Sequence, residues 1–320
     1  MTIPRSRLDP RLAGLLAGIG ADPDESQLDE LDNELIAPSA GLVSFSASCP
    51  SRPDGNSINL SIVRPAADGP LPCVYYIHGG GMARYSCYTG IFRTWIRLIA
   101  HQGVAVIAVD FRNSLVPSST GDLGPYPAGL NDCVSGLRWV HEHAAELGVD
   151  PSRIIVEGES GGANLSLALG MTLLREGDLH RIRGLYVACP FIAGRWPQDR
   201  FPSSAEYDGV LLDAAGSNRS AAAYGAAAYA AGDPLAWPGF AAEDDVRGLV
   251  PTRVSVNECD PLRDEGIALY RLLLRAGVPT RCRQLMGMVH AAELFTDLVP
   301  DVSREAAADV ARFCREVSAG

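Results

Sequence analysis

The sequence contains no lysine, and all 27 of its permanently cationic side chains are arginines. Schiff-base catalysis, pyridoxal-phosphate chemistry, a Ser-x-x-Lys dyad and a Walker A loop each require a lysine, so the sequence excludes them. No run of 18 or more apolar residues is present, so we expect no transmembrane helix and no membrane insertion. The eight cysteines include no C-x-x-C pair, which argues against a zinc ribbon or a thioredoxin-like site. We expect no metal and no cofactor.

The 320 residues carry a formal net charge of −11 and no basic run. Such a surface repels phosphate backbones, so we expect no nucleic-acid partner. Cys73 and Cys189 lie in apolar runs and read as buried free thiols, which favours a reducing, cytoplasmic location. The short apolar run at 12–21 follows three arginines, but Asp9 interrupts the basic stretch. We interpret this region as an amphipathic surface helix and not as a signal peptide.

Short apolar runs alternate with helical patterns along most of the chain, which predicts a parallel sheet covered by helices on both faces. The apolar runs lie at 73–77, 104–109, 153–156, 185–189, 253–256 and 281–285. The predicted helices lie at 91–102, 129–147, 162–175, 263–276 and 303–317. Before them, residues 42–64 alternate polar and apolar side chains and predict antiparallel edge strands, and residues 1–45 are helical in tendency.

One stretch, residues 191–249, interrupts this alternation with about 60 residues that contain no clear core strand. Structureless loops of that length are uncommon within a compact domain. The stretch holds eight Trp, Phe or Tyr positions and the Ala-rich run 221–231, and that run favours helix on propensity. We therefore expect a helical insertion.

The segment Gly158-Glu159-Ser160-Gly161-Gly162 matches the G-x-S-x-G pattern. It follows an apolar strand and precedes a helix, which is the context in which a sharp turn raises a nucleophilic serine above the sheet edge. Flanking glycines let backbones pass closely, and the N–H groups at the start of the helix favour an oxyanion. Ser160 is therefore the predicted nucleophile, and the alternative is a Gly-rich helix start with an ordinary serine.

A second glycine-rich segment, His78-Gly79-Gly80-Gly81, follows another predicted core strand. Its bare N–H groups suit an oxyanion hole for acyl transfer. We assign Gly79 and Gly80 as donors, with the Gly161 N–H as the third. A flexible turn or a phosphate-binding loop is the alternative, although no Walker or G-x-G-x-x-G pattern follows. His78 is expected to shape this loop and not to act as the base.

Together these segments resemble the hormone-sensitive-lipase-like group of α/β-hydrolases, the bacterial carboxylesterases with an HGGG loop. The resemblance covers nearly the whole chain and rests on segments in the family's order: YYIHGGGM, AVDFRN, YPAGLNDC, GESGGANLSLAL and NECDPLRDEG. It implies an α/β-hydrolase fold, a mostly parallel central sheet with helices on both faces and a helical cap. The family's triad maps onto Ser160, Asp260 and His290.

The residues support this triad independently. Asp260 and His290 each follow a predicted strand, and active sites of open α/β sheets collect at the carboxyl ends of strands. The order Ser, Asp, His is that of this fold. Asp264 and Glu265 compete with Asp260, but they fall in the first turn of the next helix, where acids favour the dipole. His101, His141, His143 and His180 lie in predicted helices or at their ends.

The sequence departs from the family's commonest pattern at three places. The elbow reads GESGG where GDSAG is more frequent, the segment usually written Tyr-Arg-Leu-Ala-Pro reads FRNSLVP, and HAAEL replaces the usual His-Gly-Phe after the base. These changes leave the reaction type intact but affect any transfer of substrate preference. The resemblance also implies that Glu159 makes a polar contact supporting the acid or histidine loop. Otherwise Glu159 is exposed or paired with arginine.

The resemblance implies a cap built from residues 1–45 and 191–249, over a core formed by 46–190 and 250–320. Four aromatic residues of the insertion are candidates to line a substrate pocket, or else to pack the cap onto the core: Trp196, Tyr224, Tyr229 and Trp237. Small alanines at 221–223 and 226–228 suggest room for a bulky or aromatic alcohol portion.

These observations predict a serine carboxylesterase that hydrolyses small esters, with short acyl or aryl portions, through an acyl-enzyme. A small-molecule ester is the expected partner, and a homodimer is compatible with the resemblance. The alternatives are an amide hydrolase or deacetylase using the same triad, and a non-catalytic ligand-binding relative. The latter type loses the base, whereas His290 is present here.

Overall fold

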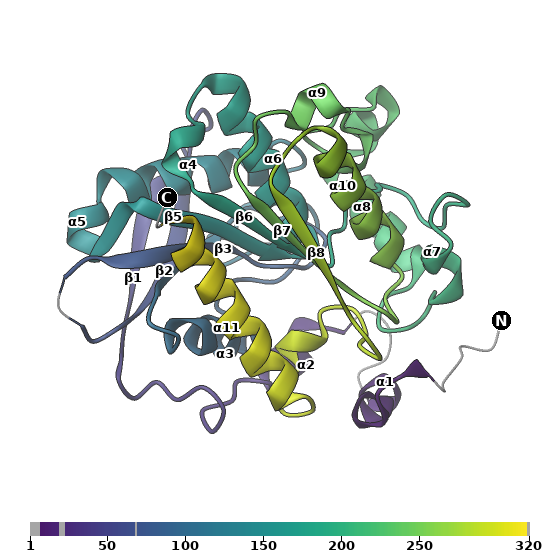
Figure 1. Cartoon of the computed structure of the whole chain (residues 1–320), viewed down its shortest axis with the longest axis horizontal. Coiled ribbons are helices and arrows are strands. Elements are labelled where there is room, and N and C mark those ends of the chain that lie inside the picture. The colour runs from purple at the N-terminus through teal and green to yellow at the C-terminus, as the bar shows by residue number, and fades with distance from the viewer. Residues whose placement is uncertain (1–6, 19–22, 68, 319–320) are drawn as a thin grey trace.

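The computed structural model describes residues 7–18, 23–67 and 69–318. A single eight-stranded sheet runs through the molecule in the order β1-β2-β4-β3-β5-β6-β7-β8 (Figure 1). β2 is antiparallel to both of its neighbours, β1 and β4, and all the pairs from β4 to β8 are parallel. The strands are β1 (Leu42–Pro50), β2 (Ser57–Pro65), β3 (Leu71–Ile77), β4 (Ala105–Asp110), β5 (Val149–Glu159), β6 (Gly184–Ala188), β7 (Thr252–Asn257) and β8 (Thr280–Leu285).

Helices connect the parallel strands and cover both faces of the sheet. The longer ones are α3 (Gly90–Ala100), α4 (Ala128–Glu142), α6 (Gly161–Glu176), α8 (Ala214–Ala231), α10 (Arg263–Arg275) and α11 (Pro300–Val317). The short α-helices are α1 (Ala13–Gly18), α2 (Glu25–Asp29), α5 (Ala144–Leu147), α7 (Ser203–Glu206) and α9 (Glu243–Val246). Single 3₁₀ turns are η2 (Pro10–Leu12), η3 (Leu179–Arg181), η4 (Pro238–Phe240) and η5 (Ala292–Leu294).

Two apolar clusters, one on each face, form the core. Helices α4, α6 and α10 pack on one face, and α3 and α11 pack on the other (Figure 1). The central strands are buried on both sides, and all six residues of β4 are inaccessible to solvent. This explains why these strands appear in the sequence as continuous apolar runs. The predicted α/β-hydrolase architecture is confirmed.

The predicted elements agree with this fold except in two places. The helix expected at 129–147 is divided, because His143 has non-helical backbone angles between α4 and α5. Its ring stacks on Trp139 and bonds the Trp139 carbonyl at 2.9 Å. The region 1–45 is less helical than expected, with only η2, α1 and α2 in its described residues. No described helix is both long and apolar enough to cross a bilayer.

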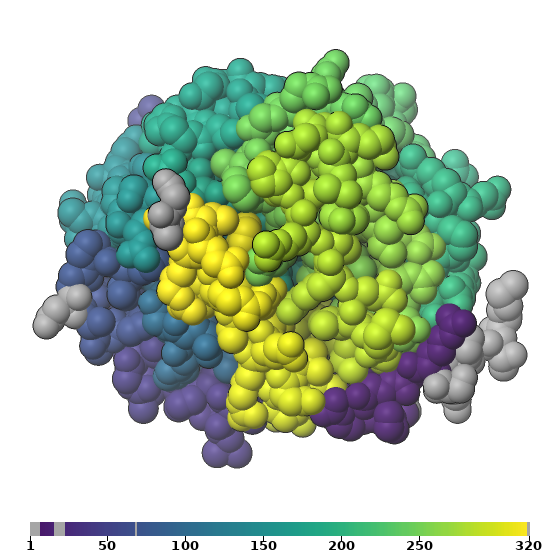
Figure 2. Space-filling view, viewed as in Figure 1, coloured from purple at the N-terminus to yellow at the C-terminus, as the bar shows by residue number. Residues whose placement is uncertain are grey.

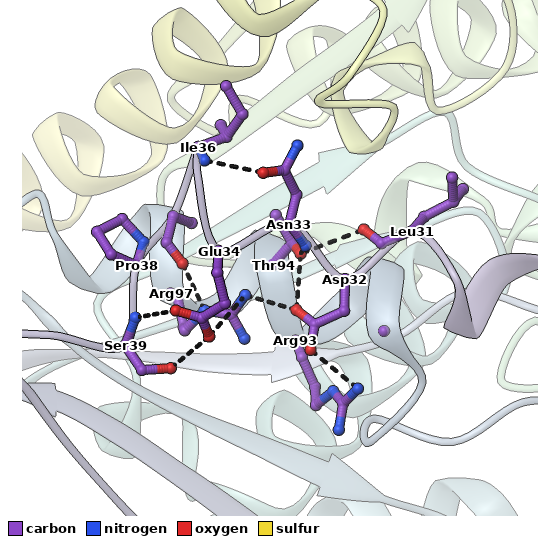
Figure 3. Close-up of polar contacts among 12 residues, drawn as sticks. Leu31, Asp32, Asn33, Glu34, Ile36, Pro38, Ser39, Arg93, Thr94 and Arg97 are labelled. Carbon is purple, nitrogen blue, oxygen red and sulfur yellow. Dashed lines mark hydrogen bonds and ion pairs between the residues drawn. The ribbon is translucent and has the colours of Figure 1, made fainter.

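Residues 31–39 lie over α3 with a single turn at 34–36, where the Ala37 N–H donates to the Asn33 carbonyl at 3.1 Å, and polar contacts hold the segment in place (Figure 3). The buried Arg97 guanidinium donates to the Ala37 carbonyl at 2.6 Å and to Asp32 at 2.5 Å. Thr94 accepts the Asn33 N–H at 2.8 Å. Side chains on α3 thus supply the backbone partners that a helix would have supplied internally, which accounts for the missing helix.

The first described residues lie against the C-terminal quarter of the chain (Figure 2). The Asp9 N–H donates to the Gly287 carbonyl at 2.9 Å, and Arg11 pairs with Asp301 at 2.6 Å. Between β6 and β7, the insertion folds into α7, α8, η4 and α9. The described residues therefore agree with the expected helical insertion. The loops that carry the predicted site residues all leave the carboxyl ends of parallel strands.

Candidate active site

Ser160 stands on a tight turn between β5 and α6. Its φ of 56° and ψ of −118° are unfavourable for a residue with a side chain. The turn is held because the Ser160 N–H donates to Ala188 at 2.9 Å and the Ser160 carbonyl accepts from Phe191 at 3.1 Å. A Cβ on Gly162 would lie 1.8 Å from the Ile77 carbonyl oxygen. Glycine is therefore required here by the close approach of the elbow to β3.

Asp260 and His290 meet although 30 residues separate them. His290 Nδ1 lies 2.9 Å from Asp260 Oδ2, and the other Asp260 oxygen accepts the Leu262 N–H at 2.8 Å. Both side chains are buried. The contact with Asp260 is the only side-chain hydrogen bond of His290 within the described residues, and it orients Nε2 as the free nitrogen of the ring.

The competing acids face other partners. Asp264 accepts the Ser203 N–H at 2.7 Å and pairs with Arg263. Glu265 accepts N–H groups from the first residues of the insertion. Neither of these carboxylates contacts His290, so Asp260 is the acid that the fold brings to the imidazole.

The other histidines are used elsewhere. Three of them bond backbone carbonyls: His101 with Pro38 at 2.7 Å, His141 with Arg181 at 3.0 Å, and His143 with Trp139 at 2.9 Å. None of these histidines lines the cavity described next.

An apolar cavity of about 110 Å³ opens at Ser160 and His290. The two side chains line this cavity together, and a hydrogen bond between such a pair often tightens only when substrate binds. The walls include the rings of Phe92, Phe191 and Phe295. Other lining residues come from the N-terminal segment, the insertion and the glycine loop at 78–81, which we call the oxyanion loop after its predicted role: Pro23, Leu28, Leu211, Gly216, Ser217, Ser220, Gly79, Gly80 and Gly81.

The glycine loop after β3 approaches the elbow closely. A Cβ on Gly161 would lie 2.7 Å from the Gly81 nitrogen, so the two backbones are in contact. Gly80 and Gly81 have φ values of 106° and 64°, which glycine adopts without strain. Neither of their N–H groups has an acceptor in the part of the chain that the structure describes. These two donors are available to a ligand in the cavity.

The predicted role of Gly79 does not agree with the structure. Its N–H donates to Glu159 Oε1 at 2.5 Å, and an amide with one hydrogen cannot serve a buried carboxyl and a substrate oxyanion equally. The Glu159 contact also differs from the expectation, since it supports the oxyanion loop and not the acid or histidine loop. Burial raises the pKa of Glu159 to about 8. The sequence analysis missed Gly81, whose N–H has no acceptor within the described residues.

His78 lies under the oxyanion loop and outside the cavity. It is fully buried, stacks on Phe111 with ring centroids 4.4 Å apart, and bonds the Gly79 carbonyl through Nδ1 at 2.8 Å. Burial lowers the pKa of His78, which favours the neutral ring. These contacts agree with a loop-shaping residue.

The four aromatic candidates of the insertion do not line the cavity. Trp196 stacks on Phe191 at 4.1 Å, Tyr224 meets Trp237 edge to face at 5.5 Å, and Tyr229 contacts Phe240. Their substrate-binding assignment is therefore wrong, and the packing alternative agrees with the structure. The rings bury large apolar areas against one another. The aromatic part of the cavity wall is formed by three phenylalanines that the sequence analysis did not assign to substrate binding.

One group of side chains within the described residues offers possible metal-ligand atoms. Cys189, Asp260 and His290 place one such atom each within 4.8 Å of one another. The geometry suits the acid–base pair better than a metal, because Asp260 and His290 already bond each other. Burial also raises the pKa of the Cys189 thiol well above its usual value, which disfavours the thiolate that a metal needs.

Comparisons with known proteins agree with this geometry. Residues 74–294 match the family model described as alpha/beta hydrolase fold. Carboxylesterase NlhH of Mycobacterium tuberculosis is 32% identical over 254 residues, covering 74% of this chain and 71% of that protein. The solved structure of esterase Est22 with p-nitrophenol superposes with a TM-score of 0.92 at 54% identity, covering 96% of this chain and 97% of that one. Brefeldin A esterase, described as a bacterial homologue of human hormone-sensitive lipase, superposes with a TM-score of 0.85 at 34% identity, covering 99% and 95%.

Proposed function

The chain belongs to the α/β-hydrolase fold family and is a carboxylic ester hydrolase, and from this premise we propose that Ser160, His290 and Asp260 are its catalytic triad. The observation that carries the proposal is the 2.9 Å contact between His290 and Asp260 at the cavity where Ser160 stands on a strained turn. Strained backbone that surrounding contacts maintain is typical of a functional site.

In the proposed acylation step, His290 Nε2 removes the Ser160 proton while Oγ attacks the ester carbonyl carbon. Asp260 holds the Nδ1–H tautomer and stabilises the imidazolium that forms. The imidazolium then returns the proton to the departing alkoxide, so the alcohol leaves and the acyl-serine remains. In the second step, the same imidazole activates water, which releases the carboxylic acid and restores the serine.

The tetrahedral intermediate carries a negative oxygen that needs fixed donors. We assign Gly80, Gly81 and Gly161 to this role and remove Gly79, whose N–H is held by Glu159. The free N–H groups of Gly80 and Gly81 and the close approach of Gly161 support the assignment. Donors arranged before the reaction stabilise the developing charge without reorganisation.

The cavity supports small esters with an apolar or aryl alcohol portion. Its walls are mostly apolar, and three of its lining residues on α8, Gly216, Ser217 and Ser220, are small. Est22 has been solved with p-nitrophenol, an aryl alcohol, and is similar over nearly the whole chain. We therefore place short-acyl aryl esters first among the substrates of this protein.

We also propose the division into cap and core. Pro23 and Leu28 from the segment 1–45 and Leu211 from the insertion 191–249 line the cavity, which supports a cap made of these two parts. Residues 46–190 and 250–320 then form the core. The free thiols, seven buried and one partly buried, support the expected cytoplasmic location. A homodimer stays a prediction, to be tested by light scattering.

The decisive experiment compares Ser160→Ala with the wild type on a panel of p-nitrophenyl and alkyl esters of increasing acyl length. The exposed Ser152 provides a matched control as Ser152→Ala. We expect Ser160→Ala to lose several orders of magnitude in kcat, on the order of 10⁴ or more, and to lose labelling by a fluorophosphonate probe. Near-normal hydrolysis by folded Ser160→Ala would overturn the triad. Activity confined to linear alkyl esters would overturn the substrate class.

A further inference from the structure

Three buried carboxyl groups at the active site, one of which (Glu159) also lines the cavity, take no part in the proposed reaction. Glu157 and Glu159 are two residues apart on β5, so their side chains lie on the same face of the strand. Glu293 lies in η5, three residues after His290. Their exposed fractions are 1%, 2% and 4%. Buried carboxylic acids without cationic partners are costly, so each requires a physical reason.

The first reason concerns the oxyanion loop. Glu159 Oε1 accepts the Gly79 N–H at 2.5 Å, at the point where the loop leaves β3. A Cβ on Gly79 would lie 2.9 Å from the same oxygen, so a side chain here would displace the Glu159 carboxyl. The next residues carry the free N–H groups of Gly80 and Gly81. Glu159 therefore fixes the starting point of the segment that presents both donors.

The second reason concerns the histidine loop. Asn257, at the end of β7, donates from Nδ2 to the Val289 carbonyl at 2.7 Å and to Glu293 Oε2 at 3.2 Å. Val289 directly precedes His290. One amide thus joins the backbone next to the base to a carboxyl of the buried group.

The charges of the three carboxyl groups affect one another's ionisation. Burial, and then the charges of Glu159 and Glu293, raise the pKa of Glu157 well above its usual value. One oxygen of Glu157 and one of Glu159 lack a hydrogen-bond partner within the described residues. Other groups that face the three carboxyls from packed elements are Tyr76 of β3, Trp95 of α3 and Arg283 of β8. His78 is the ionisable residue at the start of the oxyanion loop, and it bonds the Gly79 carbonyl.

We propose that Glu159 is a positioning residue for ester hydrolysis: with Glu157 and Glu293 it forms a buried acid cluster that holds the oxyanion loop and the histidine loop together. The proton content of this cluster sets how firmly Gly79 is held. An ionised carboxylate is a stronger acceptor than a protonated one, so loss of the Glu159 proton tightens the loop. The proposal rests on the proposed function, because the loop matters only if it stabilises the oxyanion.

The structure therefore predicts an ionisation in catalysis that does not belong to the triad. Since burial raises the pKa of Glu159 to about 8, kcat should rise as the pH passes through about 8. KM should change little, because the oxyanion hole acts on the transition state more than on the bound ester. Glu159→Gln keeps a carbonyl acceptor for Gly79 but cannot titrate, so it should retain activity and lose this rise. Glu159→Ala removes the acceptor and should lower kcat about 10²-fold.

The experiment measures kcat and KM for p-nitrophenyl acetate from pH 6 to 9.5 in the wild type, Glu159→Gln, Glu159→Ala and Glu293→Gln. The exposed Glu146 provides the control Glu146→Gln, which should follow the wild type throughout. Affinity for a boronic-acid analogue should fall together with kcat in Glu159→Ala. Glu293→Gln should shift the midpoint of the rise to lower pH, because it removes a neighbouring negative charge.

An unchanged pH profile in Glu159→Gln would overturn the positioning role. So would a loss in Glu159→Ala that appears only as reduced stability or as raised KM. Failure of the proposed function is recognised separately. In that case Ser160→Ala stays active or the wild type does not react with the fluorophosphonate probe, whereas failure of this inference leaves both of those results intact.

Discussion

Replacing Glu265 with glutamine should change how the stability of this protein depends on pH. Glu265 is fully buried in the first turn of α10 and holds the start of the insertion. One oxygen accepts the N–H groups of Ile192 and Ala193 at 2.7 and 3.1 Å, and the other accepts Trp196 Nε1–H at 2.7 Å. Glutamine keeps one carbonyl oxygen but turns an NH₂ toward one donor, at a cost of about 1–3 kcal/mol.

Burial raises the pKa of Glu265 from 4.5 to about 8. The folded protein thus keeps a proton that the unfolded chain releases, so this stabilisation is complete below pH 4.5 and is lost as the pH rises to about 8. A pKa difference of that size corresponds to roughly 5 kcal/mol of folding free energy. Glutamine does not titrate, so the variant should start less stable than the wild type at pH 5 and approach or exceed it at pH 9.

Urea unfolding of both proteins at pH 5, 7 and 9, with a reductant to protect the thiols, measures this difference directly. The other buried acids are common to both proteins and cancel in the comparison. Glu265→Ala gives the upper limit of the loss in unfolding free energy, because it leaves three N–H donors unpaired. Three such donors cost roughly 3–9 kcal/mol, which is comparable with the whole stability of a domain. A free-energy difference between wild type and Glu265→Gln that is constant from pH 5 to pH 9 would refute the reasoning.

Two further substitutions test the geometry of the cavity. Gly162→Ala would bring a Cβ within 1.8 Å of the Ile77 carbonyl, so the elbow must move and kcat should fall at least about 10²-fold; wild-type kcat in a folded variant, checked by circular dichroism, would contradict the close approach. Ser220→Leu places a large side chain next to Gly81: a Cβ built on Gly81 would lie only 3.2 Å from the Ser220 Cβ. It should lower kcat/KM more for aryl esters with long acyl chains than for p-nitrophenyl acetate, and an equal loss on all esters would count against a size-selective wall.

The sequence by itself determined the class of fold and the order of its parts. Strands such as β4 are buried on both faces, and for this reason they appear as unbroken apolar runs that periodicity recognises. The G-x-S-x-G turn was recognisable for a similar reason, since backbone contact with β3 permits only glycine at position 162. Asp260 and His290 follow strands, and the carboxyl ends of parallel strands must meet at one edge.

Only the tertiary structure decided which N–H groups near Ser160 lack an acceptor within the described residues and which side chains line the cavity. Gly79 and Gly81 are both glycines of one motif, so the sequence does not distinguish them. They differ because the Glu159 carboxyl, at the end of the neighbouring strand, accepts the N–H of Gly79. The four predicted aromatic residues of the insertion pack on other aromatic rings, while Phe92, Phe191 and Phe295 line the cavity. Hydrogen bonds and side-chain packing between distant segments depend on distances in space, and local sequence patterns carry no record of those distances.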